Sequence, residues 1–159
     1  MNIKKTISLL ALFVILIVSV LPINATDITE RDGNIIYFED GSYLEISEVR
    51  IVDTNMSRAA QTITGAKDMT YTNEDGEVEW KYTLTASFTY DPGVSSTCTS
   101  ATYSNTIYDN NWSFSNGYAS RGGNAAHGSG LYIKKVLLIK VKEVEVSINI
   151  TCDTYGNLS

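Results

Sequence analysis

The chain has 159 residues, of which 12 are basic and 18 acidic, and its formal net charge at pH 7 is −6. This length suits one ordinary domain, and the acidic balance argues against nucleic acid as a partner because like charges repel. Ten tyrosines, eleven glycines and only two prolines, with many threonines and serines, are typical of an all-β protein.

The first 25 residues have the three-part layout of a secretory signal peptide. Lys4 and Lys5 provide a positive start, an uncharged apolar run follows at 7–21, and Ala25 suits cleavage. The apolar run has fifteen residues, fewer than the ~20 that span a bilayer. A cleaved signal is therefore favoured over the alternative, a retained membrane anchor, and we predict a secreted, extracellular protein.

Cleavage after Ala25 leaves residues 26–159 as one domain with a net charge of −8, since Lys4 and Lys5 are removed with the signal. Such a surface repels anionic membranes as well as nucleic acid. We expect no membrane partner once the signal has been cleaved.

Two β-hairpins are predicted in the first half of this domain. The first has apolar runs at 35–38 and 43–51 on either side of Asp40-Gly41, and Asp-Gly between apolar runs is a strong hairpin signal. The second turns at residues 73–77, which include another Asp-Gly pair. Residues 53–65, between the hairpins, are polar and weakly patterned, so we expect a loop or linker there, with a frayed strand or a short helix as alternatives.

Two later stretches show the alternation of a half-buried strand, in which every second side chain is apolar. One is 80–90, with large aromatic side chains on one face and mostly threonines on the other, and the second is 144–152. The first should lie in the middle of a sheet that packs against another sheet. The expected core residues are Trp80, Tyr82, Leu84, Phe88, Val144, Val146, Ile148 and Ile150.

The strands between these two stretches are less clearly marked. Residues 95–108 are rich in serine and threonine, aromatic residues mark a strand at 112–118, and 125–142 lead towards the last strand. A turn is expected near Lys142-Glu143, although no glycine marks it. About seven to nine strands, with turn signals about every 8 to 12 residues, favour a single antiparallel β-sandwich.

The two cysteines, Cys98 and Cys152, are predicted to form a structural disulfide, because export leads to an oxidising compartment. The bond would close a loop of more than fifty residues, a constraint worth roughly 4 kcal/mol in the chain-entropy model. A pair of reactive thiols is the alternative, but there is no Cys-x-x-Cys spacing and no nearby cation. With Trp112 between them, the cysteines resemble those of immunoglobulin domains, although Ile150 stands where those domains have tyrosine. The sandwich is therefore immunoglobulin-like only in the loose sense.

No catalytic motif, metal-ligand spacing or nucleotide-binding loop is present, so we predict no catalytic residue, no metal site and no cofactor. His127 is the only histidine and has small neighbours. The acidic stretches 74–79 and 109–111 do not follow the calcium-loop pattern and are interpreted as solvated turns. Exposed aromatic side chains can stack on a sugar or anchor a protein, and the candidates for a binding face are Tyr103, Tyr108, Tyr118 and Tyr132.

Several motifs in the second half of the chain form a recognisable set. They are the run from Trp80 to Asp91, the Ser-Thr-Cys-Thr-Ser-Ala around Cys98, Ile107-Tyr108 followed by Trp112, Gly123-Asn124-Ala125, and the ending from Thr151 to Ser159. Together they resemble small exported proteins of clostridia-type Gram-positive bacteria, over roughly Lys67 to Ser159. The resemblance implies a bacterial, extracellular setting and transfers no active-site residue.

Three functions are compatible with these observations. The favoured one is a secreted, non-catalytic binding module of the bacterial cell envelope or exterior, with an unknown protein or glycan at the cell surface as its partner. The second is a secreted hydrolase with a carboxylate-based site, because two carboxylates in a cleft need no local motif. The third is an exported toxin or bacteriocin-like protein.

Overall fold

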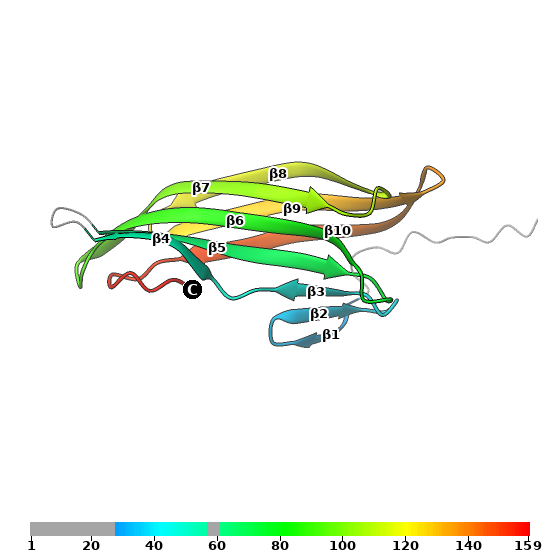
Figure 1. Cartoon of the computed structure of the whole chain (residues 1–159), viewed down its shortest axis with the longest axis horizontal. Helices are drawn as coiled ribbons and strands as arrows, with labels where there is room; N and C mark the ends of the chain where they lie inside the picture. The colour runs from blue at the N-terminus through cyan, green and yellow to red at the C-terminus, as the bar shows by residue number, and fades with distance from the viewer. Residues whose placement is uncertain (1–27, 57–60) are drawn as a thin grey trace, which may run out of the picture.

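The computed structural model describes residues 28–56 and 61–159, and this part of the chain consists of antiparallel β-strands in two facing sheets (Figure 1). The predicted signal peptide lies outside the described residues. Within them, no helix has the length and apolar character needed to cross a membrane. The strands are β1 (Ile28–Asp32), β2 (Ile35–Phe38), β3 (Tyr43–Ile46), β4 (Arg50–Met56), β5 (Gln61–Thr72), β6 (Val78–Asp91), β7 (Ser95–Ile107), β8 (Trp112–Gly122), β9 (Ala125–Val136) and β10 (Ile139–Thr151).

The larger sheet has seven strands in the order β1-β2-β3-β5-β6-β7, with β4 paired to β5 beyond the end of β3. The smaller sheet has three strands in the order β10-β9-β8. Edge strands of the two sheets, β7 and β8, lie next to each other, and β10 contacts β5 and β6 (Figure 1). The predicted sandwich is confirmed. Strand β6 lies between β5 and β7, so it is inside the larger sheet, as predicted.

The alternation seen in the sequence decides which faces meet. In β6 and in most of β10, buried and more exposed residues alternate, so both strands present an apolar face to the space between the sheets. All eight core residues predicted from the pattern are buried, the most exposed being Ile148 at 3%. The two hairpins predicted around Asp40-Gly41 and residues 73–77 are also confirmed, as β2–β3 and β5–β6.

Aromatic rings fill one end of the core. The ring of Trp80 stacks on Tyr132 at 3.7 Å and on Tyr71 at 5.3 Å between centroids. Trp112 contacts this stack edge-on, at 5.9 Å from Trp80. Large rings in fixed mutual orientation make this end of the sandwich well packed.

Two predictions about the chain path are wrong. Residues 53–65, expected to be a loop, belong to β4 and β5 wherever the structure describes them, because ladder partners satisfy their backbone groups. The last hairpin turns at Leu137-Leu138, five residues before the expected turn at Lys142-Glu143. Lys142 and Glu143 lie inside β10 instead, paired with β9.

The predicted disulfide between Cys98 and Cys152 is not present, and both residues are buried free thiols. Each thiol is directed to a carbonyl of its own segment, Cys98 Sγ to Ser100 O at 3.3 Å and Cys152 Sγ to Asp153 O at 3.4 Å. Burial raises the pKa of both thiols. They behave as small apolar groups in the core, so the final strand is held by packing and hydrogen bonds.

Candidate functional site

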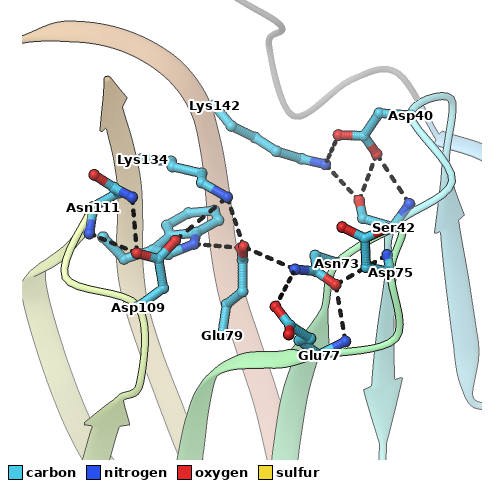
Figure 2. A network of polar contacts seen from close by, with 11 residues as sticks. Asp40, Ser42, Asn73, Asp75, Glu77, Glu79, Asp109, Asn111, Lys134 and Lys142 are labelled. Atoms are coloured by element: carbon cyan, nitrogen blue, oxygen red, sulfur yellow. Dashed lines mark hydrogen bonds and ion pairs between the residues drawn. The ribbon is translucent and has the colours of Figure 1, made fainter. Parts of the chain in front are cut away.

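A network of charged side chains lies at one end of the sandwich (Figure 2). It joins the β2–β3, β5–β6 and β7–β8 turns to the two strands of the β9–β10 hairpin. The hairpin therefore has two parts at this end. We call its segment with Lys134 and Lys142 the stem, and residues Val136–Ile139 beyond it the tip.

Glu79 on β6 is the acceptor at the centre of the network. It is 5% exposed, and its Oε1 accepts a hydrogen bond from Lys134 Nζ at 2.6 Å and a longer one from Asn73 Nδ2 at 3.4 Å. Its Oε2 accepts one from the indole nitrogen of Trp112 at 2.6 Å. A buried carboxylate is stable only with such partners, so Glu79 joins the larger sheet to β8 and β9 of the smaller one.

Lys142 on β10 is the second buried charge, at 4% exposed. Its Nζ donates to Asp40 Oδ2 and to Ser42 Oγ, both at 2.6 Å, and lies 4.3 Å from the ring centroid of Phe38 and 5.1 Å from that of Tyr71. Burial lowers the pKa of Lys142, although Asp40 acts in the opposite direction. The acid and the two rings together replace the water that the ammonium group has lost.

The two stem lysines are direct partners across the β9–β10 ladder. Like charges opposite each other destabilise a sheet, and here each lysine has its own acid. Lys134 binds Glu79 at 2.6 Å and Asp109 at 3.5 Å, and Lys142 binds Asp40. Burial alone would lower the pKa of Lys134, but these two acids raise it above its ordinary value. The stem is thereby fixed to strand β6, to the β2–β3 turn and to the connection between β7 and β8.

A pocket of about 320 Å³ opens beside the network, lined by both stem lysines and by Asp40, Ser42 and Glu79 among others. Ser42 Oγ contacts Lys142 Nζ, which resembles the serine–lysine pairs of some hydrolases. Ser42 is only 1% exposed, and its hydroxyl also donates to Asp40 Oδ1 at 2.5 Å. Because Lys142 is ion-paired and so protonated, it has no lone pair with which to activate the serine. The contact orders the β2–β3 turn.

The tip has the opposite character. Leu137 and Leu138 are 91% and 95% exposed, and Val136 and Ile139 beside them are also exposed. Both leucines have positive φ, 49° and 70°, as the two central residues of a type I′ hairpin turn require. Asn and Gly favour this conformation, whereas leucine is disfavoured in it. In Figure 1 the orange tip extends past the ends of β7 and β8.

The structure separates the four tyrosines predicted to form a binding face. Tyr132 is completely buried in the aromatic core, so its assignment to a binding face is wrong. Tyr103 and Tyr118 lie near the β7–β8 boundary, where both contact Tyr82. Tyr108 follows β7 at the network end, where its N–H bonds to the carbonyl of Glu79. The other three tyrosines, Tyr103, Tyr108 and Tyr118, are exposed. Because Tyr132 is buried, the predicted face of four tyrosines does not exist.

The other residues considered from the sequence have local roles. His127 Nδ1 hydrogen-bonds Asn149 Oδ1 at 2.8 Å across the β9–β10 ladder. The acidic turns are structured by their own side chains, with Asn73 Oδ1 accepting from two backbone N–H groups and Asp109 Oδ1 from Asn111. In residues 28–56 and 61–159, no three His, Cys, Asp or Glu side chains are grouped as a metal site would need.

Neither the network nor the tip was predicted from the sequence. The four network residues Asp40, Glu79, Lys134 and Lys142 come from distant segments, so no local pattern connects them. The tip did carry a local signal. Four consecutive apolar residues with lysines on both sides, in Lys134-Lys-Val-Leu-Leu-Ile-Lys140, interrupt the alternation of a half-buried strand.

Comparisons of the chain with protein-family models, with curated proteins and with solved structures give no match.

Proposed function

We propose that the protein is a secreted, non-catalytic binding module of the bacterial cell envelope or exterior, and that it binds through the tip of the β9–β10 hairpin. The observation that carries this proposal is the tip itself, where Leu137 and Leu138 are almost fully exposed in a conformation that leucine disfavours. The exported setting rests on the signal-peptide pattern and on the resemblance to small exported clostridia-type proteins.

Strain of this kind persists only where the surrounding structure imposes it, and it is concentrated at functional sites. Here the stem imposes it, since Lys134 and Lys142 fix both strands below the turn. Neither leucine belongs to the hydrophobic core or to the partly buried residues that pack against it in the described chain. The leucines therefore add little to the stability of the fold. An external partner explains their exposure better than a role in the fold does.

The network supports binding over the carboxylate-based hydrolase. A general acid at neutral pH needs a carboxyl group whose pKa is raised. Burial raises the pKa of Asp40, but hydrogen bonds from Lys142 and Ser42 outweigh burial, and the pKa is lowered overall. Glu79, the buried carboxylate of the pocket, is fully engaged by three donors.

The test is capture of the secreted protein on intact cells and on purified cell-wall and membrane fractions of the producing bacterium and its neighbours. The variant Leu137→Asn/Leu138→Gly supplies the turn residues that a type I′ hairpin favours and removes the apolar side chains. Val94→Asn is the control, because Val94 is 71% exposed in the β6–β7 turn at the other end of the sandwich.

We expect the wild-type protein and Val94→Asn to be captured equally. The tip variant should not be captured. Equal capture of all three proteins would contradict binding through the tip. Turnover of envelope polymers by the protein would favour the hydrolase, and growth inhibition of neighbouring cells would favour the exported toxin or bacteriocin-like protein.

A further inference from the structure

We propose that the partner of the tip is the surface of a lipid bilayer, into which Val136–Ile139 insert while Lys135 and Lys140 contact anionic headgroups. This inference rests on the proposed function, because it names the partner of the same site. It departs from the expectation, based on total charge, that the mature chain has no membrane partner.

The apolar surface of the tip forms the end of the hairpin. Val136 and Ile139 are ladder partners, so their side chains lie on the same face of the ribbon, and the two leucines occupy the turn between them, where they are 91% and 95% exposed. Further along β10 the alternation returns, with Glu143 and Glu145 on the opposite face from Val144. The leucines are therefore open to solvent on nearly all sides, and the hydrocarbon of a bilayer would surround them, whereas a groove on a protein would cover only part of them.

Lysines flank the apolar segment at one level. Lys135 and Lys140 are exposed and are direct partners in the ladder, immediately below Val136 and Ile139. Lys140 has an exposed ion pair with Glu143 at 2.9 Å, and Lys135 has no ion-pair partner among the described residues. Exposed pairs of this kind are weak, so both ammonium groups are available to phosphate groups.

The dimensions suit shallow insertion. Leu137 lies two residues beyond Lys135, which is about 7 Å along a strand. Interfacial segments bury their apolar side chains roughly 5–10 Å deep, at the boundary between headgroups and acyl chains. With the leucines at that depth, the flanking lysines lie at the level of the headgroups, where long side chains extend their ammonium groups to the polar layer.

The acidic surface of the domain is partly neutralised near the tip. The two stem lysines pair with Glu79, Asp109 and Asp40, so two of these three negative charges are compensated. Insertion of the apolar tip supplies the main attraction, and the two exposed lysines add a preference for anionic lipid that salt weakens.

The experiment is co-sedimentation of the protein, recovered from the medium after export of the full chain, with two kinds of vesicle. One kind contains phosphatidylcholine alone, and the other contains phosphatidylcholine mixed with phosphatidylglycerol. The proteins are the wild type, Leu137→Asn/Leu138→Gly, Lys135→Gln/Lys140→Gln and the control Val94→Asn. Mass spectrometry confirms that all four have the same N-terminus, and urea unfolding confirms that all four are folded.

We expect binding to both kinds of vesicle, tighter with phosphatidylglycerol. The leucine variant should bind at least about tenfold more weakly to both, because two large apolar side chains no longer leave water. The lysine variant should lose only the preference for phosphatidylglycerol, and Val94→Asn should bind like the wild type.

Absence of vesicle binding by the wild type, or equal binding by the leucine variant, would overturn this inference. Cell-wall material contains no bilayer. If the wild type were captured on it and the leucine variant were not, the proposed function would hold with a different partner. If neither assay distinguished the tip variant from the wild type, both the inference and the proposed function would be wrong.

Discussion

The stem and the tip of the β9–β10 hairpin are a few residues apart. In both, the usual distribution of residue types is reversed, because a charged residue is buried in the stem and apolar residues are exposed in the tip. In the stem, Lys142 is 4% exposed, whereas in the tip Leu138 is 95% exposed. Charged residues are rarely buried unless they are paired. Single exposed leucines are common, but two adjacent exposed leucines that both have positive φ are uncommon. The fold accounts for the stem lysines through their partners, and the described residues contain no such partner for the leucines.

The comparison shows which part of the hairpin serves the fold and which is available for a ligand. Each stem lysine neutralises an acid that is itself held by other groups, so the stem is a connected unit. In the described chain, the two leucines of the tip belong neither to the core nor to the residues packed against it. Changes in the stem should therefore alter stability, and changes in the tip should alter binding.

The largest effect is expected from removing the central acid of the network, which holds the stem. Glu79→Ala leaves Lys134 and the indole N–H of Trp112 without their main partner, and breaking a buried ion pair in this way costs about 3–5 kcal/mol of unfolding free energy. Glu77→Ala is the matched control, because Glu77 is exposed and its carboxylate has only a 3.4 Å contact with Asn73. Urea unfolding measures both variants, and equal losses would mean that the network does not stabilise the stem.

A core position of β10 gives the next largest effect. Ile148→Ala should lose about 2–5 kcal/mol, because Ile148 is 3% exposed and its truncation leaves a cavity between the sheets. Asn149→Ala, on the exposed face, should lose far less, since it removes only a surface contact with His127. The same urea series tests this pair, and similar losses would contradict the assigned faces of β10.

The tip substitution should have a smaller effect and the opposite sign. Leu137→Asn/Leu138→Gly relieves the positive-φ strain, so the unfolding free energy should rise by about 1–2 kcal/mol. A stabilised variant that no longer binds would separate the two parts of the hairpin clearly. A loss of stability in this variant would show instead that the leucines serve the fold.

Acid should act on the stem and leave the tip unchanged. The pKa of Asp40 in the folded protein is lower than its ordinary value of 3.8, so the unfolded chain binds a proton first as pH falls. The stabilisation from this group is therefore complete above about pH 4 and is lost as pH falls through the lowered pKa of the folded state. We expect the melting temperature to drop less in Asp40→Asn than in the wild type between about pH 4 and pH 2, and parallel curves would contradict this.

The strands and the core could be predicted because their signals are local. Alternation from Trp80 to Tyr90 and from Val144 to Cys152 identified both inner faces, and Asp-Gly pairs identified two turns. The predicted loop at 53–65 failed because its β4 part is a polar strand at the sheet edge without a distinctive pattern, and its β5 part is defined by pairing with β4 and β6. The disulfide was predicted from cysteine number and export alone, and neither determines where a thiol is directed.

The candidate site could be predicted only in part. The apolar run between lysines is visible in the sequence, but it was interpreted as strand, because Leu137-Leu138 has none of the residues that favour a type I′ turn. The network could not be found in this way, since Asp40 and Lys142 are about a hundred positions apart.

The sequence by itself determined the all-β class, the two inner faces and the apolar content of the tip, because side-chain alternation and composition act between near neighbours. Only the tertiary structure decided which acid neutralises which lysine, where the last hairpin turns and that the leucines are left in solvent. Those outcomes depend on the register of β9 against β10 and on the packing of one sheet on the other, which join residues far apart in the chain.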